Sequence, residues 1–263
     1  AMSVLRLVLF ALLVLTGTAS AQERLPDGGV ATASGDVAQA WYGQPTTRYD
    51  HGILGDRVEG GSLVVIDRTG SRHELVLPER YVFEDLTPRL VDLDGDGASE
   101  IVTIRTDVGA GAAVAVYGLR DGTLVERSAT APIGRSHRWL SIAAIANFTA
   151  DAGKEIAIVK TPHIGGVLEI LSLKGSVLET ILPPQSGYST HFIGSRDISL
   201  ARAEDTDSDG FFELALPTQD RRQIVVLGFS PGVHAVARFD TGAVITRPIG
   251  SFTAAVTAAR QPQ

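Results

Sequence analysis

Two short segments of this sequence have the residue types and the spacing of a metal site built from oxygen ligands. Residues 92–100 read DLDGDGASE and residues 205–213 read DTDSDGFFE. In each segment three aspartates alternate with other residues, a glycine follows, and a glutamate closes the pattern. The aspartates of such a loop point to one side, and the glycine lets the backbone turn so that a carbonyl and the last carboxylate reach the same centre. Six to eight hard oxygens at about 2.3–2.6 Å suit Ca²⁺.

The pattern therefore predicts two calcium sites, each with four carboxylates and one backbone carbonyl as ligands. In the first loop these are Asp92, Asp94, Asp96, Glu100 and the carbonyl of Ala98. In the second loop they are Asp205, Asp207, Asp209, Glu213 and the carbonyl of Phe211. A solvated acidic turn is the alternative, but four acids at matching offsets in two places are more specific than such a turn requires.

The two loops are not EF-hands. An EF-hand loop needs a bidentate glutamate at its twelfth position and a helix on either side. The twelfth positions here are Thr103 and Leu216, and each loop runs into a stretch with strand character.

A third segment between the two loops keeps the offsets but has lost two carboxylates. Residues 147–155 read NFTADAGKE, so that Asn147, Thr149, Asp151 and Glu155 occupy the ligand positions and Ala152 replaces the glycine. The loop either binds Ca²⁺ weakly or keeps its shape through hydrogen bonds of the Asn and Thr side chains. We favour the second, metal-free alternative.

Short apolar or alternating runs cover most of the remaining chain. They are rich in Val, Ile and Leu and are bounded by Gly, Asp, Pro or Ser, which is typical of β-strands. The runs are SLVVID, EIVTIRT, AAVAVYGL, EIAIVKT, VLEILSL, ELALPT and QIVVLGF. Beyond the N-terminal segment, no stretch keeps a helical period for three turns. The sequence therefore predicts an all-β protein.

Three segments repeat one order of strands and loops, and Phe83, His137 and His191 mark a spacing of 54 residues. The repeats run over about 81–134, 135–188 and 189–240. A fainter copy lies at 29–80, and the tail 241–263 can supply a strand that closes the array. Repeated four-stranded units of this length are typical of β-propeller blades around a central channel. We predict a small propeller of four blades, or five if the N-terminal segment and the tail combine; a two-sheet sandwich would not explain the period.

The acidic loops and their flanks resemble the FG-GAP or VCBS repeats of integrin-type β-propellers, of the exported bacterial type. The resemblance rests on VDLDGDGASEIV, EDTDSDGFFELA and the weakened ANFTADAGKEIA, and it covers roughly residues 81–240. It implies Ca²⁺ in the loop between the first two strands of a blade, and often a role in binding or adhesion. The small number of repeats departs from the seven blades usual in that family.

The chain begins with a segment that fits a secretory signal peptide. Arg6 precedes a continuous apolar run at residues 7–15, and Ala19-Ser20-Ala21 has the small-x-small pattern of a cleavage site. A transmembrane anchor is the alternative, but the run is shorter than the roughly 20 residues that a spanning helix needs. We expect residues 1–21 to be removed and residues 22–263 to form one periplasmic or secreted domain with no membrane span. The sequence has no cysteine, so disulfides contribute nothing to its stability.

The predicted fold gathers polar side chains on the face opposite the acidic loops. Loops that enter a blade, and loops between its second and third strands, lie on that face and carry four of the six histidines. The candidate ligand-binding residues are His51, Asp56, Glu84, His137, Arg138, His163, His191 and Arg196. Each also has a structural interpretation, as a partner of loop backbone or as an ion pair between blades. Together they are a default ligand-site hypothesis.

These observations favour a binding module for a polar or anionic ligand, which could be a small molecule, a glycan or a protein. The net charge of −7 and the lack of a Lys/Arg cluster argue against a nucleic-acid partner. A hydrolase or lyase that uses His and Glu or Asp of the same face is the alternative, although the sequence has no nucleophile elbow and no phosphate-binding glycine motif. A transition metal on the histidines is less favoured, because no closely spaced histidine pair exists. A purely structural envelope protein is a third hypothesis.

Overall fold

The computed structural model describes residues 24–260, which form an all-β protein with three antiparallel sheets and one short helix. The predicted fold class is confirmed at this level. The proposed signal peptide lies outside the described residues. Within residues 24–260, no helix is both long enough and apolar enough to span a bilayer.

The first sheet contains nine strands and combines the first two predicted repeats. Its strands are β1 (Ala31–Thr32), β2 (Val37–Thr46), β3 (Glu59–Asp67), β4 (Arg72–Val76), β5 (Tyr81–Phe83), β6 (Arg89–Val91), β7 (Glu100–Asp107), β8 (Gly111–Arg120) and β9 (Thr123–Ala129). The short strand β5 joins the two halves, because it pairs with β3 through Gly60 and with β7 along its whole length. A Cβ at Gly60 would lie 2.9 Å from the Cβ of Tyr42 and 3.3 Å from that of Phe83, so only glycine allows this approach.

The other two sheets each correspond to one predicted repeat. The second contains β10 (Leu140–Ala146), β11 (Glu155–Lys160), β12 (Val167–Lys174), β13 (Val177–Thr180) and β14 (Gln185–Ser186). The third contains β15 (Arg202–Glu204), β16 (Glu213–Pro217), β17 (Gln223–Gly228) and β18 (His234–Asp240). In both, four strands pair with their sequence neighbours as an antiparallel meander, with β14 added beside β12.

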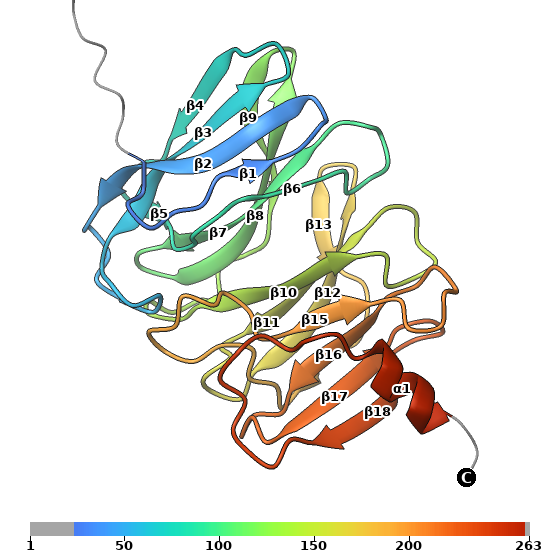
Figure 1. The fold of residues 1–263 in the computed structure, drawn as a ribbon. Coiled ribbons are helices and arrows are strands. Elements are labelled where there is room, and N and C mark those ends of the chain that lie inside the picture. The colour runs from blue at the N-terminus through green and yellow to red at the C-terminus, as the bar shows by residue number, and fades with distance from the viewer. Residues whose placement is uncertain (1–23, 261–263) are drawn as a thin grey trace, which may run out of the picture.

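A closed ring of four separate blades is not what Figure 1 shows. The strands of the first repeat (β2–β4) and of the last (β15–β18) lie at opposite ends of the molecule, and the sheets follow one another between them. The ring also fails because two repeats share one sheet through β5.

The predicted closing strand in the tail is wrong, because residues 253–260 form helix α1 (Thr253–Arg260). The sequence TAAVTAAR is rich in alanine, the strongest helix former. Glu204 of β15 accepts hydrogen bonds from the backbone N–H groups of Phe252 and Thr253 at 2.9 and 3.0 Å, which satisfies two donors at the helix start. Val256 is fully buried and packs with Phe252 against the third sheet.

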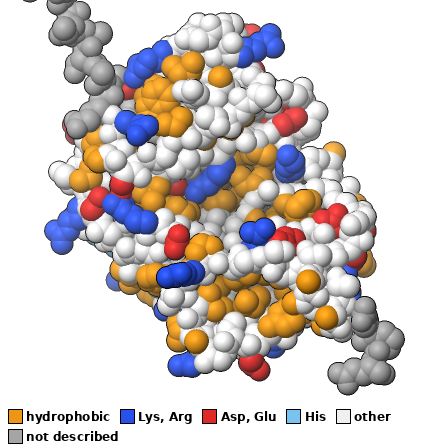
Figure 2. All heavy atoms as spheres, in the orientation of Figure 1, with side chains coloured by type: hydrophobic (Ala, Val, Ile, Leu, Met, Phe, Trp, Pro, Cys, Tyr) orange, Lys and Arg blue, Asp and Glu red, His pale blue; other side chains and the backbone are white. Residues whose placement is uncertain are grey.

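Apolar side chains fill the spaces between neighbouring sheets. One cluster joins the first and second sheets through side chains such as Val102, Val114 and Ile158. Another joins the second and third sheets, where the rings of Phe148 and Phe229 meet edge to face at 5.1 Å. On the face that Figure 2 shows, Lys and Arg side chains, acidic side chains and apolar side chains are interspersed.

The meander topology sends alternate connections to opposite ends of the strands. The loops β6–β7, β10–β11 and β15–β16 lie at one end of the strands, here called the acidic end, and contain the three acidic segments. The next connections along each repeat therefore lie at the opposite end of the strands, here called the pocket end. They are β7–β8, β11–β12 and β16–β17, together with the β2–β3 connection at residues 47–58.

Candidate functional site

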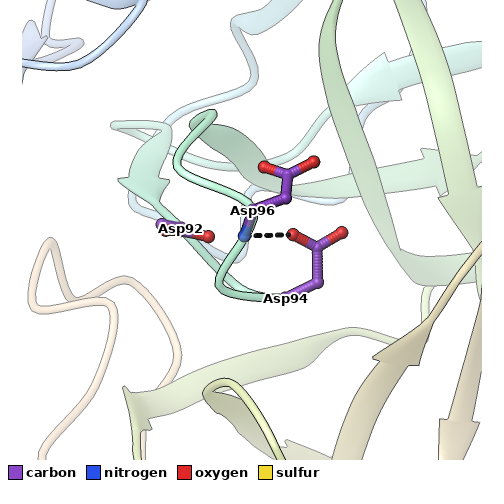
Figure 3. A group of neighbouring side chains, drawn as sticks. All are labelled: Asp92, Asp94 and Asp96. Carbon is purple, nitrogen blue, oxygen red and sulfur yellow. Dashed lines mark hydrogen bonds between the residues drawn. The ribbon is translucent and has the colours of Figure 1, made fainter.

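The first acidic loop brings three carboxylates together. One oxygen each from Asp92, Asp94 and Asp96 lie within 4.8 Å of one another. In Figure 3 all three side chains come from the same loop, and the amide of Asp96 donates to Asp94 Oδ1 at 3.3 Å. Gly95 and Gly97, with φ of 77° and 86°, donate their amides to the two oxygens of Asp92 at 2.8 and 3.1 Å. The glycines therefore supply the left-handed turns that bend the loop around its own carboxylates.

The second loop repeats this arrangement and contains a carboxylate oxygen with no partner. Asp205, Asp207 and Asp209 each place an oxygen within 4.8 Å of the others. Asp205 Oδ2 accepts from the amide of Gly210 at 3.0 Å, whereas Asp205 Oδ1 is buried and has no hydrogen bond. A buried, unpaired carboxylate oxygen is costly unless a cation or a donor meets it. The donor set of both triads, hard oxygens only, fits Ca²⁺.

The glutamates that close the loops bind backbone of their own loop, and ligation of Ca²⁺ by Glu100 and Glu213 stays a prediction. Each accepts a hydrogen bond from the backbone N–H seven residues earlier. The pairs are Glu100 with Leu93 at 2.8 Å, Glu155 with Phe148 at 2.7 Å and Glu213 with Thr206 at 2.9 Å. These carboxylates hold the two ends of each loop together, whether the loop has kept its aspartates or not. Within residues 24–260, the groups of side chains close enough to share an ion contain the aspartates and not the glutamates.

The two predicted carbonyl ligands follow the third aspartate of each loop. The amide of Ala98 donates to Asp96 Oδ1 and the amide of Phe211 donates to Asp209 Oδ1, both at 2.8 Å. These hydrogen bonds fix the backbone where each carbonyl was expected to turn inwards. Carbonyl ligation by Ala98 and Phe211 remains a prediction.

A guanidinium lies beside each triad. Arg127 of β9 contacts Asp94 Oδ2 at 3.1 Å and pairs with the buried Glu100. Arg260, at the end of α1, contacts Asp207 Oδ2 at 2.6 Å and Glu213 Oε1 at 3.4 Å. These positive charges reduce the repulsion between neighbouring carboxylates and compete with a bound cation for the same oxygens.

The decayed middle loop connects the two intact ones through the backbone. The amide of Lys154 donates to the carbonyl of Leu93 in the first loop at 2.7 Å. Asn147 donates its side-chain amide to the carbonyl of Gly210 in the second acidic loop, 205–213, at 2.8 Å. The backbone carbonyl of Asn147 accepts from the amide of Phe212 in the same loop. Thr149 accepts from the amide of Asp151 at 3.2 Å. The Asn and Thr hydrogen bonds proposed for this loop are therefore present.

The substitution Asn147→Asp is expected to destabilise the protein by about 1–3 kcal/mol, although it restores the first residue of the acidic pattern. The carboxylate has no proton to donate to Gly210 and places a negative charge against that carbonyl. Urea denaturation of Asn147→Asp and Asn147→Ala measures the effect, and Asn147→Ala should lose less, because it adds no charge. If Asn147→Asp were as stable as the wild type or more stable, the hydrogen bond from Asn147 to the second acidic loop would contribute nothing to stability.

At the end of the strands opposite the acidic loops, side chains from three repeats surround a pocket of about 230 Å³. The lining comes from the β2–β3 connection, the segment before β10, the β11–β12 turn and the segment before β15. The residues are His51, Ile53, His137, Arg138, Trp139, Thr161, His163, Ile164 and Ile193. Four of the eight predicted ligand-binding residues, namely His51, His137, Arg138 and His163, therefore line one cavity.

His51 is held by the buried carboxylate of Glu84. The distance from His51 Nδ1 to Glu84 Oε1 is 2.6 Å, and Thr106 Oγ1 donates to the other oxygen at 2.7 Å. Glu84 is fully buried, and its burial raises the pKa of the carboxyl, while His51 acts in the opposite direction. The backbone carbonyl of Glu84 also accepts from the indole of Trp139 at 3.0 Å. Glu84 therefore orients His51 from beneath the pocket.

His137 is presented by a backbone in the left-handed region, with φ of 56°. Such a conformation is uncommon for a residue with a side chain and concentrates at functional sites. The amide of His137 donates to Tyr49 Oη at 2.8 Å, the two rings stack at 5.1 Å, and Nε2 lies 3.0 Å from Asp50 Oδ1. Burial raises the pKa of Tyr49 to about 12. Tyr49 and Asp50 were absent from the predicted site, although they directly precede His51.

His163 and His191 form a hydrogen-bonded pair behind the pocket. His191 Nε2 lies 3.1 Å from the carbonyl of Ser195, so this nitrogen carries the proton. His191 Nδ1 then accepts from His163 Nε2 at 2.9 Å. Burial lowers the pKa of both imidazoles to about 4. Both rings are therefore neutral at pH 7, and the ring of Trp139 packs 4.7 Å from that of His191.

Asp56 and Arg196 do not line the pocket but join the loops that do. Arg196 Nη2 lies 2.9 Å from Asp56 Oδ2 and also pairs with Asp27. Beside this ion pair, the amide of Gly194 donates to the carbonyl of Ile53 at 2.8 Å. The connection at 47–58 thus meets the loop before β15, although the sheets that carry them are far apart in Figure 1.

Near the pocket, the structure buries a glutamate that the sequence pattern did not single out. Glu59, the first residue of β3, is 3% exposed, and within residues 24–260 its carboxyl has no hydrogen bond or ion pair. Burial, and then the neighbouring Glu84 and Asp56, raise its pKa to about 10. The carboxyl is therefore protonated at neutral pH.

The histidines do not form a metal cluster. In the part of the chain that the structure describes, the two aspartate triads are the groups whose ligand atoms could share an ion. Convergence of the imidazoles instead produces a pocket lined by hydrogen-bonding ring nitrogens and one guanidinium, Arg138. No protein-family model matches this sequence, and a search of the curated proteins found no match, so the resemblance to FG-GAP or VCBS repeats rests on the acidic loops themselves.

Proposed function

We propose that this protein is an exported, calcium-stabilised binding module for a polar or anionic ligand, with carbohydrate as the favoured class. Its acidic-loop repeats would be of the FG-GAP or VCBS kind. The observation that carries the proposal is the pocket, where His51 of the repeat at 29–80 meets His137 and His163 of the repeat at 135–188, beside Arg138. These side chains come from loops that are far apart in the sequence and converge on one cavity with a few polar groups, which is the usual form of a ligand site.

The lining of the pocket defines the kind of ligand. Imidazole nitrogens can donate or accept hydrogen bonds, which suits hydroxyl groups, and Arg138 supplies a positive charge at the wall. Ile164 and Ile193 are 64% and 68% exposed and line the same cavity, so the ligand also needs an apolar face. A sugar ring has hydroxyls around its edge and C–H groups on its faces, and it meets both requirements.

Calcium has a structural role in this proposal. The triads lie directly before β7 and β16, the strands that run from the acidic loops to the end of the sheets where the pocket lies. A cation in each triad would fix the start of these strands and, through the middle loop, their spacing. Periplasmic or secreted proteins meet far more Ca²⁺ than cytosolic ones, and sites of modest affinity then stay filled.

The paired His51 and Glu84 support a second candidate function, as a hydrolase or lyase. A buried carboxylate that holds one nitrogen of an imidazole leaves the other nitrogen available as a general base. His51 lines the pocket, and within the described residues its Nε2 has no hydrogen bond. Turnover that disappears in both His51→Gln and Glu84→Gln, with binding retained, would favour the enzyme over the binding module.

Binding measurements on a glycan array and by calorimetry test the main proposal. The variant His137→Ala/Arg138→Ala should bind every ligand found with an affinity that is lower by about 10-fold or more, because it removes a stacked imidazole and the charge at the wall. His234→Ala is the matched control, since this histidine lies on β18, outside the pocket, and should leave affinity unchanged. Retained affinity of the double variant for every ligand would assign binding to another surface.

A further inference from the structure

A second cavity of about 250 Å³ adjoins the histidine pocket. Its lining comes from the β11–β12 turn, the loop before β15 and the β16–β17 turn. The residues are His163, Ser189, Phe192, Ile193, Gln219 and Arg221. His163 and Ile193 also line the first pocket, so a ligand can extend from one cavity into the other.

Two polar atoms in the wall of this second cavity have no partner. Gln219 Oε1 and Arg221 Nε are buried and make no hydrogen bond. The orientation of the amide is fixed, because Gln219 Nε2 donates to the carbonyl of Pro162 at 3.3 Å and leaves Oε1 as the free acceptor. Buried polar atoms are almost always hydrogen-bonded, so one orphan donor and one orphan acceptor in the same cavity point to an absent ligand or to water.

The charge of Arg221 is also uncompensated. Within residues 24–260 its side chain has no ion pair or hydrogen bond, and its guanidinium lies over the ring of Phe192 at 5.4 Å. The adjacent carboxylate of Asp220 forms no ion pair with it and accepts instead from Thr218 Oγ1 at 2.6 Å and from the amide of Arg222 at 3.0 Å. Arg196, in the neighbouring loop, is by contrast paired with Asp56 and Asp27.

The turn that carries Arg221 is rigid and strained. Arg221 has a φ of 55°, and its amide donates to the carbonyl of Thr218 at 2.8 Å. The amide of Thr218 donates to the carbonyl of Gln223 at 2.9 Å, and the amide of Ile245 donates to the carbonyl of Arg221 at 2.7 Å. The turn and the tail thus hold a non-glycine residue in the left-handed region, which is typical of residues positioned for function.

We infer that this second cavity is an oxyanion subsite and that the ligand is an acidic sugar, such as a uronic acid. The guanidinium of Arg221 matches a carboxylate, which it can bind through two parallel hydrogen bonds. Gln219 Oε1 accepts a hydrogen bond from a hydroxyl next to that carboxylate. The remaining part of the ligand passes His163 and Ile193 into the histidine pocket. This inference rests on the proposed binding function and narrows its ligand class.

The test uses calorimetry with the calcium-loaded mature protein and three probes: D-galacturonate, trigalacturonate and D-galactose. The wild type should bind the acids more tightly than the neutral sugar. Arg221→Gln should lose about 10- to 100-fold in affinity for the acids, the range expected for hydrogen bonds to a charged group. Gln219→Leu, which removes the acceptor, should lose less. Arg222→Gln is the matched control, because it removes the same charge one residue away, on an exposed side chain.

The outcomes separate this inference from the proposed function. Unchanged affinity of Arg221→Gln for the acids, together with a loss in His137→Ala/Arg138→Ala, would overturn the subsite and keep the binding module. Equal affinity for galactose and galacturonate, or no binding of either acid, would also overturn the subsite. If only trigalacturonate binds, and Arg221→Gln abolishes that binding, the subsite receives one unit of a longer acidic chain.

Discussion

Removal of calcium with excess EGTA is expected to lower the melting temperature of the mature protein by roughly 10–20 °C. An ion that binds only the folded state contributes about 2.7 kcal/mol at one hundred times its dissociation constant, and the two triads would contribute twice. In a chain of this size each kcal/mol shifts the melting temperature by about 2–4 °C. Without the ion, the clustered carboxylates also repel one another.

Scanning calorimetry with EGTA, and then with Ca²⁺ restored, measures this shift. Asp94→Asn and Asp207→Asn each impair one triad, so each should lose about half of the calcium-dependent stabilisation. Asp121→Asn is a control, because this aspartate lies in the exposed β8–β9 turn, outside the acidic loops. A melting curve that EGTA does not change would reject both sites.

The substitution Glu59→Gln is expected to stabilise the protein at pH 7 by about 1–3 kcal/mol. The pKa of Glu59 is raised to about 10 in the folded protein, whereas a glutamate in the unfolded chain titrates near 4.5. Folding at pH 7 must therefore place a proton on this carboxyl, at a cost of about 1.4 kcal/mol for each pH unit above the unfolded value. Glutamine is neutral, close in shape, and avoids that cost.

The sign of the pH dependence distinguishes this cause from a packing effect. The wild type loses stability through Glu59 as the pH rises from about 4.5 towards 10, so the gain from Glu59→Gln should be largest above pH 7 and vanish near pH 4.5. Urea denaturation at pH 5, 7 and 8.5 measures it. Glu79→Gln, the same change on an exposed residue, should show no such trend. A gain that is constant with pH would contradict the buried, protonated state of Glu59.

Local patterns in the sequence were sufficient for the strands and the triads. The runs EIVTIRT and ELALPT became β7 and β16, because alternating apolar residues next to Gly and Asp fit a buried strand after a turn. Alternation also placed three aspartates of each loop together. The period of 54 residues placed His137 and His191 at equivalent entries to the second and third sheets, from which the convergence of histidines followed.

The features that depend on contacts between distant segments could not be predicted in this way. The merger of two repeats depends on Gly60, whose missing side chain lets β5 approach β3. The roles of Glu100 and Glu213 depend on backbone donors seven residues away, which compete with the role of ligand. Nothing in the sequence marks Glu59 as buried, because its burial and the neighbouring charge of Glu84 arise from contacts between distant segments.

The tail and the β2–β3 connection show the same limit. The tail 241–263 was expected to supply a strand, but residues 253–260 form a helix whose first N–H groups donate to Glu204. The connection at 47–58 reaches the loop before β15 through Asp56 and Arg196, two residues that were predicted as ligand contacts and act as an ion pair between loops. Charge type alone does not distinguish these roles.

Calorimetric titration of the EGTA-stripped, dialysed protein with Ca²⁺ tests the two triads most directly, because it counts the bound ions. The predicted result is two ions per chain for the wild type, and one ion for a variant in which Asp92, Asp94 and Asp96, or Asp205, Asp207 and Asp209, are all replaced by asparagine. Absence of binding by the folded wild type, or two ions bound by either triple variant, would contradict the assignment of calcium to these loops.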